Sequence, residues 1–143
     1  MPSPDGRVDL RSDTVTRPTD AMRRAMAAAE VGDDGMREDP TVNELEAVFA
    51  NRLGKEAALF VPSGTMANQI ALRLLGVPGT SVVVGRRQHV VTYENGGAAT
   101  NSSVQFHLVD DSDGTVKPDD VRWAIEAAEI GRASCRERVL CVV

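Results

Sequence analysis

The residues Pro62-Ser63-Gly64-Thr65 have the types and order of a site for an anion. They lie between an apolar run of strand length, residues 57–61, and a helical pattern over residues 65–75. A glycine lets a ligand approach the backbone, and the free N–H groups of a helix start point outward beside the hydroxyls of Ser63 and Thr65. The lysine of an ATP-type phosphate loop and the three glycines of a dinucleotide motif are missing. Alone, the segment is equally compatible with a plain capped turn.

His89 is the second residue whose position favours chemistry. It follows a predicted strand at residues 81–84 after a polar link, and open α/β sheets bind ligands at the carboxyl ends of their strands. Glu94 follows in the sequence, and the glycines at 96 and 97 permit close approach of a chain element or a cofactor. A lone histidine is also often a satisfied polar group, and we interpret His107, inside a strand pattern, as structural.

Two polar segments carry further binding groups. Residues 9–18 are dense in side chains that could bind a carboxylate or hold a loop, and the alternative is a solvated leader. Residues 32–40 gather acidic side chains around two glycines, but the spacing fits neither a calcium loop nor another metal site. We therefore predict no metal site and interpret residues 32–40 as a helix-capping loop.

Helices and strands alternate in the pattern that would position these groups. Thr19 can cap a helix over residues 21–29, and Asp39 with Pro40 can begin a helix that ends at Gly54. The apolar face of that second helix, Val42, Leu45, Phe49 and Leu53, has the spacing of a core face. Residues 81–84 and 104–109 are strand candidates: the first is apolar throughout, as in a strand covered on both faces, and the second alternates. A last helix spans residues 118–128, so we predict an α/β fold.

Composition excludes several classes of function. The chain has 143 residues, a formal net charge of −5 and no apolar stretch that could cross a bilayer. Its cationic side chains are scattered and its aromatic residues are few, which argues against a nucleic-acid surface. The first six residues carry no secretory signal, so we expect a cytoplasmic protein that binds neither nucleic acid nor membrane.

The last fifteen residues, 129–143, differ in character from the rest. Residues 129–139 match, codon by codon, one reading frame of a common sequencing adapter, although a genuine helix end followed by a basic turn is the alternative. We therefore expect a non-native tail. Both cysteines, Cys135 and Cys141, fall within it, so they support no redox or metal argument.

The order of these motifs resembles that of L-threonine aldolases, within the group of β-eliminating lyases and threonine aldolases. The resemblance runs from about Val8 to about Ala128, and its motifs are listed here: Asp9-Leu-Arg-Ser-Asp-Thr-Val-Thr-Arg-Pro18, Gly32-Asp-Asp with Glu38-Asp-Pro-Thr-Val-Asn43, Pro62-Ser-Gly-Thr65 with Asn68, and His89 with Glu94-Asn-Gly-Gly97. It implies an enzyme of fold type I that uses pyridoxal 5′-phosphate, with an amino acid as substrate and a homodimer or homotetramer as assembly.

The resemblance also implies roles for individual residues. Ser63, Gly64, Thr65 and Met66 would hold the cofactor phosphate. His89 would stack on the pyridine ring and assist proton transfer at the substrate hydroxyl, with Glu94 orienting it. Ser12 would lie near the substrate carboxylate.

Two departures from the family pattern matter. Met36 stands where many relatives carry a tyrosine that reaches a neighbouring subunit, which affects substrate preference. The lysine that holds the cofactor, the aspartate that pairs with its pyridine nitrogen and the arginine for the substrate carboxylate have no counterpart, and neither Lys55 nor Lys117 matches the lysine motif.

We accordingly predict the division 1–18 polar segment, 19–56 helical segment, 57–128 start of the large cofactor domain and 129–143 tail. The expected parent enzyme cleaves threonine or allo-threonine to glycine and acetaldehyde, and the chain alone is expected to be inactive. The alternatives are a β-eliminating lyase of the same family and a non-catalytic phosphate-binding module.

Overall fold

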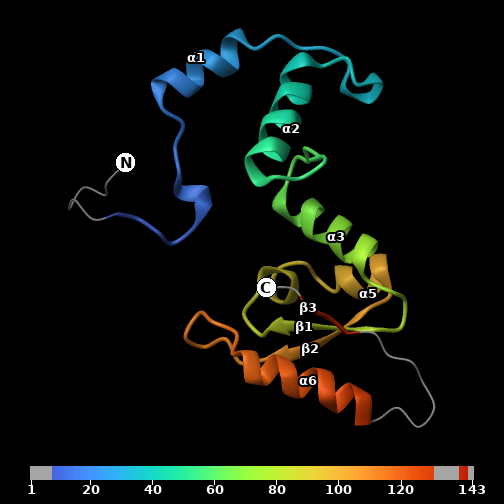
Figure 1. Ribbon diagram of the computed structural model, residues 1–143. Coiled ribbons are helices and arrows are strands. Elements are labelled where there is room, and N and C mark those ends of the chain that lie inside the picture. Colours follow the sequence, from blue (N-terminus) through green and yellow to red (C-terminus); the bar gives the residue numbers. More distant parts are fainter. Residues whose placement is uncertain (1–7, 131–138, 142–143) are drawn as a thin grey trace. The chain divides into compact units, whose positions relative to one another are not determined.

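The computed structural model describes residues 8–130 and 139–141, which fall into two compact units divided after Phe60 (Figure 1). In the first unit the regular elements are helices: the 3-10 helix η1 (Asp13–Val15), α1 (Asp20–Ala28), the 3-10 helix η2 (Asp34–Met36) and α2 (Pro40–Leu53). α1 lies within one residue of its predicted bounds. Its start is fixed because Thr19 Oγ1 accepts a hydrogen bond from the N–H of Met22 at 3.2 Å.

The start and end of α2 confirm the helix-capping interpretation. Asp39 accepts hydrogen bonds from the N–H groups of Gly32 and Val42, both at 2.9 Å, and these bonds hold its pKa below the usual value. A Cβ on Gly32 would lie 2.3 Å from the carbonyl oxygen of Glu38, so only glycine fits there. Gly54 ends the helix in the left-handed conformation, with φ of 62°.

The predicted core face of α2 is mostly exposed, contrary to our expectation. Leu45, Phe49 and Leu53 keep 48%, 54% and 56% of their surface exposed, whereas Ala50 is buried. The spacing of apolar residues indicates which face of a helix should be buried, but that face is buried only when another element packs against it. Within the described residues of the first unit, no other element supplies that layer.

The strand predicted at residues 57–61 is absent from the described structure. This segment is irregular, and Leu59 and Phe60 are exposed at 68% and 50%. A strand is stable only when a neighbour pairs with its backbone groups. Here the N–H of Phe60 donates instead to the side chain of Glu46, at 2.7 Å to Oε1.

The second unit alternates helices with three parallel strands. In chain order its elements are α3 (Gly64–Leu75), β1 (Ser81–Gly85), α4 (His89–Thr92), α5 (Gly97–Ser102), β2 (Gln105–Val109), α6 (Pro118–Ile130) and β3 (Val139–Cys141). The strand order is β2-β1-β3, which places β1 in the middle. The predicted helix over residues 65–75 and the predicted strands at 81–84 and 104–109 are therefore present, each within one residue.

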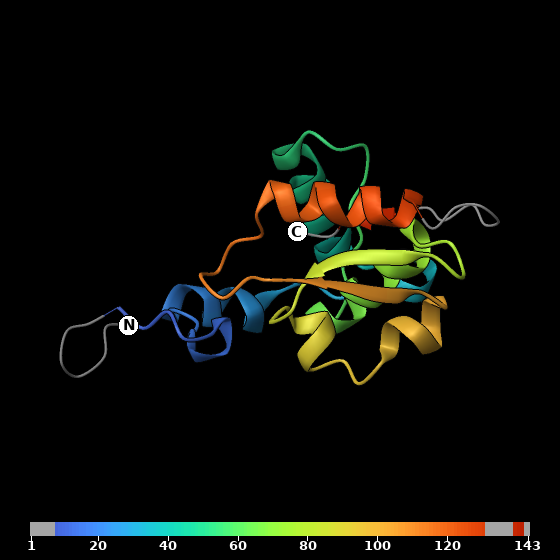
Figure 2. The ribbon, with the colours of Figure 1, turned by 90° about the horizontal axis from the view of Figure 1, so that it is seen from below.

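β1 is apolar throughout because it is covered on both faces, as predicted. Val82 and Val84 pack on one face with α3, α4 and α5, in a cluster that includes Leu72, Val90, Ala98 and Val104. Val83 faces the other way and packs with Val109 and Ala124, beneath α6. Figure 2 shows α6 on one side of the strands and α4 and α5 on the other.

This layering follows from the handedness of the connections. The chain moves from β1 to β2 through α4 and α5, and then returns past β1 to β3 through α6. Right-handed crossovers that move in opposite directions place their helices on opposite faces of a sheet. The carboxyl ends of β1 and β2 consequently share one edge, and His89 and Asp111 each follow one of these ends.

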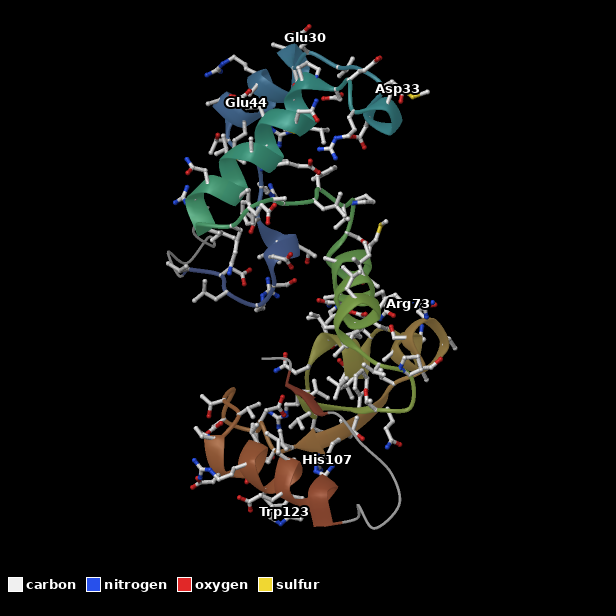
Figure 3. The ribbon with its side chains drawn as sticks, turned by 45° about the vertical axis from the view of Figure 1, so that its right-hand side comes forward. Glu30, Asp33, Glu44, Arg73, His107 and Trp123 are labelled. Carbon is white, nitrogen blue, oxygen red and sulfur yellow. The ribbon has the colours of Figure 1, made fainter. Side chains whose placement is uncertain are left out.

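The predicted alternation of β2 holds only in part. Phe106 is half-buried against the core, but Leu108 is 42% exposed although it pairs with the buried Val84. In the described sheet β2 is an edge strand, and the helices cover the central strand β1 more completely than they cover β2. On the other face the ring of His107 lies beside that of Trp123, with centroids 5.7 Å apart (Figure 3).

α6 extends two residues past its predicted end, to Ile130. Of the predicted tail, residues 131–138 and 142–143 lie outside the described residues, whereas Val139–Cys141 pairs with β1 as β3. The non-native origin of the tail stays a prediction. No helix in the described ranges has the length and hydropathy needed to cross a membrane.

Replacing Asp39 with alanine should loosen the start of α2, because the N–H groups of Gly32 and Val42 would lose their acceptor. We expect faster hydrogen exchange at the Val42 amide and a weaker helical circular dichroism signal. The matched control is Asp34→Ala, which removes an exposed aspartate of the same loop. Unchanged exchange at Val42 in the Asp39 variant would contradict the capping role.

Candidate functional site

The start of α3 carries backbone and side-chain donors of the kind that an anion could use. Ser63 is in an extended conformation, and its Oγ accepts a hydrogen bond from the N–H of Met66 at 3.2 Å. In the described structure the N–H groups of Gly64 and Thr65 have no acceptor, as expected for the first turn of a helix. A Cβ on Gly64 would meet no atom within 4 Å, so the surface above this turn is open.

His89 begins α4 at the carboxyl end of β1, and it contacts Glu94 directly. His89 Nδ1 lies 2.8 Å from Glu94 Oε1, and the ring of Tyr93 is 5.1 Å from the imidazole between centroids. The two partners differ in exposure: 56% of the histidine side chain is exposed, but only 1% of the glutamate side chain. The imidazole is thus held from its buried side while its other edge remains accessible.

Glu94 also binds α3, which sequence reasoning did not anticipate. Asn68 Nδ2 donates to Oε1 at 2.8 Å, and Gln69 Nε2 donates to Oε2 at 2.6 Å. Burial raises the pKa of Glu94, but the hydrogen bonds from Asn68, Gln69 and His89 outweigh burial and bring the pKa below its usual value. One buried carboxylate therefore joins α3 to the histidine.

Gly97 lets α5 approach this cluster. A Cβ at Gly97 would lie 2.8 Å from three side-chain atoms of Gln69, so a larger residue would displace that amide. Asn101 of α5 donates to Gln69 Oε1 at 3.0 Å and completes the contact. We predicted that the glycines at 96 and 97 permit a close approach, and at Gly97 the side chain of Gln69 makes it. Gly96 has φ of 75°, a conformation that favours glycine before α5.

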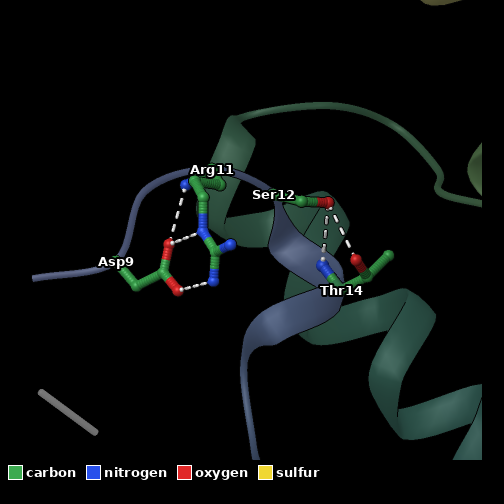
Figure 4. Close-up of polar contacts among 4 residues, drawn as sticks. All are labelled: Asp9, Arg11, Ser12 and Thr14. Atoms are coloured by element: carbon green, nitrogen blue, oxygen red, sulfur yellow. Dashed lines mark hydrogen bonds and ion pairs between the residues drawn. The ribbon is translucent and has the colours of Figure 1, made fainter. Parts of the chain in front are cut away.

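Ser12 belongs to the first unit, so a role beside His89 stays a prediction. Its Oγ lies 2.9 Å from Thr14 Oγ1 and accepts the N–H of Thr14 at 3.2 Å, which caps η1 (Figure 4). Next to it, Arg11 binds both carboxylate oxygens of Asp9, at 2.9 and 2.6 Å. This exposed pair immediately precedes the turn that contains Ser12.

The remaining sequence candidates are Met36, Lys55 and Lys117. Met36 is 72% exposed in η2 of the first unit. Lys55 directly follows the helix-ending Gly54, and Lys117 precedes α6. Hydrogen bonds from Thr115 lower the pKa of Asp113, and the positive charge of Lys117 adds to this effect. In the described ranges, no group of three or more His, Cys, Asp or Glu could hold a metal ion.

The profile of the beta-eliminating lyase family matches residues 9–142. The low-specificity L-threonine aldolase 1 of Arabidopsis thaliana is 47% identical over 137 residues, covering 94% of this chain and 38% of the relative. That of Escherichia coli K12 is 47% identical over 127 residues, covering 82% of this chain and 38% of the relative.

A solved structure is similar in fold. It is a protein of Listeria monocytogenes provisionally assigned as an L-allo-threonine aldolase, with a TM-score of 0.57 at 24% identity, covering 88% of this chain and 35% of that one. This likeness and the small parallel sheet confirm the predicted α/β fold class. The chain spans 38% of the length of the curated relatives described above.

Replacing Glu94 with alanine should destabilise the second unit. The change leaves the polar groups of Asn68 and Gln69 without their buried acceptor, which costs about 1–3 kcal/mol. Urea unfolding followed by the fluorescence of Trp123 measures the effect. Glu126→Ala, on the exposed surface of α6, is the control and should change little. Equal stability of the two variants would show that the cluster does not support the fold.

The contribution of Glu94 should also depend on pH. A carboxyl group whose pKa is lower in the folded state stabilises the fold above its unfolded pKa, and this contribution is lost as the pH falls through the folded pKa. The difference in unfolding free energy between the unaltered chain and Glu94→Gln should therefore shrink between about pH 5.5 and pH 3. A difference that stays constant over this interval would contradict the lowered pKa.

Proposed function

The chain belongs to the beta-eliminating lyase family, and from this premise we propose that its parent protein is a pyridoxal 5′-phosphate-dependent aldolase that cleaves threonine or allo-threonine to glycine and acetaldehyde. The names of the aligned relatives support an aldolase over other reactions of the family. The single observation that carries the proposal is the carboxylate of Glu94, which contacts both the anion-site helix and His89.

The start of α3 fits the cofactor phosphate. The unpaired N–H groups of Gly64 and Thr65 and the hydroxyls of Ser63 and Thr65 are donors, and these residues are exposed. The positive end of a helix favours an anion by about 0.3–2 kcal/mol before individual hydrogen bonds are counted. Met66, the fourth proposed phosphate residue, uses its N–H to bind Ser63 Oγ, which holds the turn in shape.

His89 fits the proton transfer that the reaction needs. Cleavage of the Cα–Cβ bond of a β-hydroxy amino acid removes the proton of the hydroxyl group, so a base must accept it. If Nδ1–H donates to Glu94, the lone pair of the imidazole lies on Nε2, where it can accept that proton. When bound, pyridoxal phosphate supplies the electron withdrawal that C–C cleavage requires. The exposed imidazole can also stack on the cofactor ring.

The substrate and the assembly follow as further parts of the proposal. Ser12 would contact the carboxylate of the amino acid, with its hydroxyl held in the capped turn of η1. Met36 in place of a tyrosine would alter the preference among β-hydroxy amino acids. The exposed apolar face of α2 supports contact with the rest of the parent or with a second copy, in a homodimer or homotetramer. A cytoplasmic location rests on the sequence alone.

The chain by itself should be catalytically inactive. Lys55 and Lys117 are its two lysines, and neither matches the lysine motif of the family: Lys55 follows the end of α2, and Lys117 precedes α6. The chain mixed with pyridoxal phosphate should therefore give no borohydride-trappable adduct at either lysine, as measured by peptide mass spectrometry. A stoichiometric adduct at Lys55 or Lys117 would contradict the claim of inactivity.

The aldolase proposal is tested on a full-length protein that contains this sequence. We expect glycine and acetaldehyde from threonine or allo-threonine, and His89→Asn should lower kcat by about 10²–10⁴-fold, the usual contribution of a general base. Release of ammonia and a keto acid would favour the β-eliminating alternative. Phosphate binding without either reaction would favour the non-catalytic module.

A further inference from the structure

Asp111 is a buried carboxylate to which the proposed reaction gives no role. It follows the end of β2 and is 3% exposed, whereas its neighbour Asp110 is exposed. Burying a carboxylate is costly unless its oxygens accept hydrogen bonds. The partners of Asp111 therefore indicate what it does.

These partners lie on the short link between β1 and α4. The N–H of Arg87 lies 3.1 and 3.0 Å from the two carboxylate oxygens of Asp111, and Gln88 Nε2 approaches Oδ2 at 3.4 Å. The guanidinium of Arg87 does not bind Asp111 but donates a hydrogen bond to the carbonyl oxygen of Ser112 at 3.1 Å. The carboxylate thus holds the backbone of the link, in addition to one side chain.

The end of β1 is shaped to accept this carboxylate. A Cβ on Gly85 would lie 2.5 Å from Asp111 Oδ2, so the glycine leaves the space that the carboxylate fills. The N–H of Arg86 donates to the carbonyl oxygen of Val109 at 3.0 Å, which continues the strand pairing past the sheet. The link is therefore attached to the end of β2 by both backbone and side chain.

His89 lies immediately beyond this attachment. The carbonyl oxygen of Gln88 accepts the N–H groups of Val91 and Thr92 at 3.0 and 3.1 Å, so the first turn of α4 starts from the attached link. We propose that Asp111 is a positioning residue for His89: it fixes the backbone before the histidine, so that the imidazole meets Glu94. The catalytic meaning of this contact rests on the proposed function, but the contact itself does not.

Nuclear magnetic resonance on the full chain tests the proposal without cofactor or substrate. The chain contains two histidines, so His107, which faces α6, is an internal reference. In Asp111→Asn the backbone order parameter of His89 should fall from about 0.85 to below about 0.6, and its ring resonances should shift, while those of His107 stay unchanged. Asp110→Asn is the matched control, and it should leave both histidines unchanged.

A folded Asp111→Asn variant with an unchanged His89 would overturn the proposal. If the variant does not fold, hydrogen exchange in the unaltered chain decides: the Arg87 amide should exchange more slowly than that of exposed Asp113, and equal rates would overturn the proposal. A full-length protein without aldolase activity would refute the proposed function and leave these measurements intact.

Discussion

The buried carboxylate of Glu94 is the interaction on which the arrangement of the second unit depends. Its two oxygens accept hydrogen bonds from Asn68 and Gln69 of α3 and contact the imidazole of His89. A buried carboxylate with several donors stays ionised and fixes each donor in place, because losing any one of them leaves a charge poorly solvated. Glu94 therefore holds α3, whose start is proposed to bind the phosphate, and His89, the proposed base, in a fixed relative position.

The sheet beneath gives this cluster its rigidity. β1 is buried on both faces, so the chain that leaves it toward His89 starts from a well-packed strand, and Asp111 extends that support beyond the strand end. The two side chains also differ in exposure: Glu94 is buried, and about half of His89 is exposed. Such an arrangement suits proton transfer, since one nitrogen of the imidazole is fixed internally and the other can face a substrate.

Local sequence signals predicted local structure well. The caps at Thr19 and Asp39, the doubly covered β1 and the helix after Ser63 were all recognisable, because their causes lie within a few residues. Features that depend on distant partners were not. Residues 57–61 have strand composition but no strand beside them in the described structure, and the apolar face of α2 lacks a covering layer. Likewise Gln69 and Asp111 bind residues more than twenty positions away, and no spacing rule connects such partners.

The central claim is that one carboxylate couples α3 to His89, and a double-mutant cycle measures this coupling directly. The variants are Asn68→Ala, His89→Ala and their combination, with unfolding free energies from urea titration. Because both side chains contact Oε1 of Glu94, the account predicts a coupling energy of about 0.5–3 kcal/mol. Additive effects, within about 0.3–0.5 kcal/mol, would contradict it.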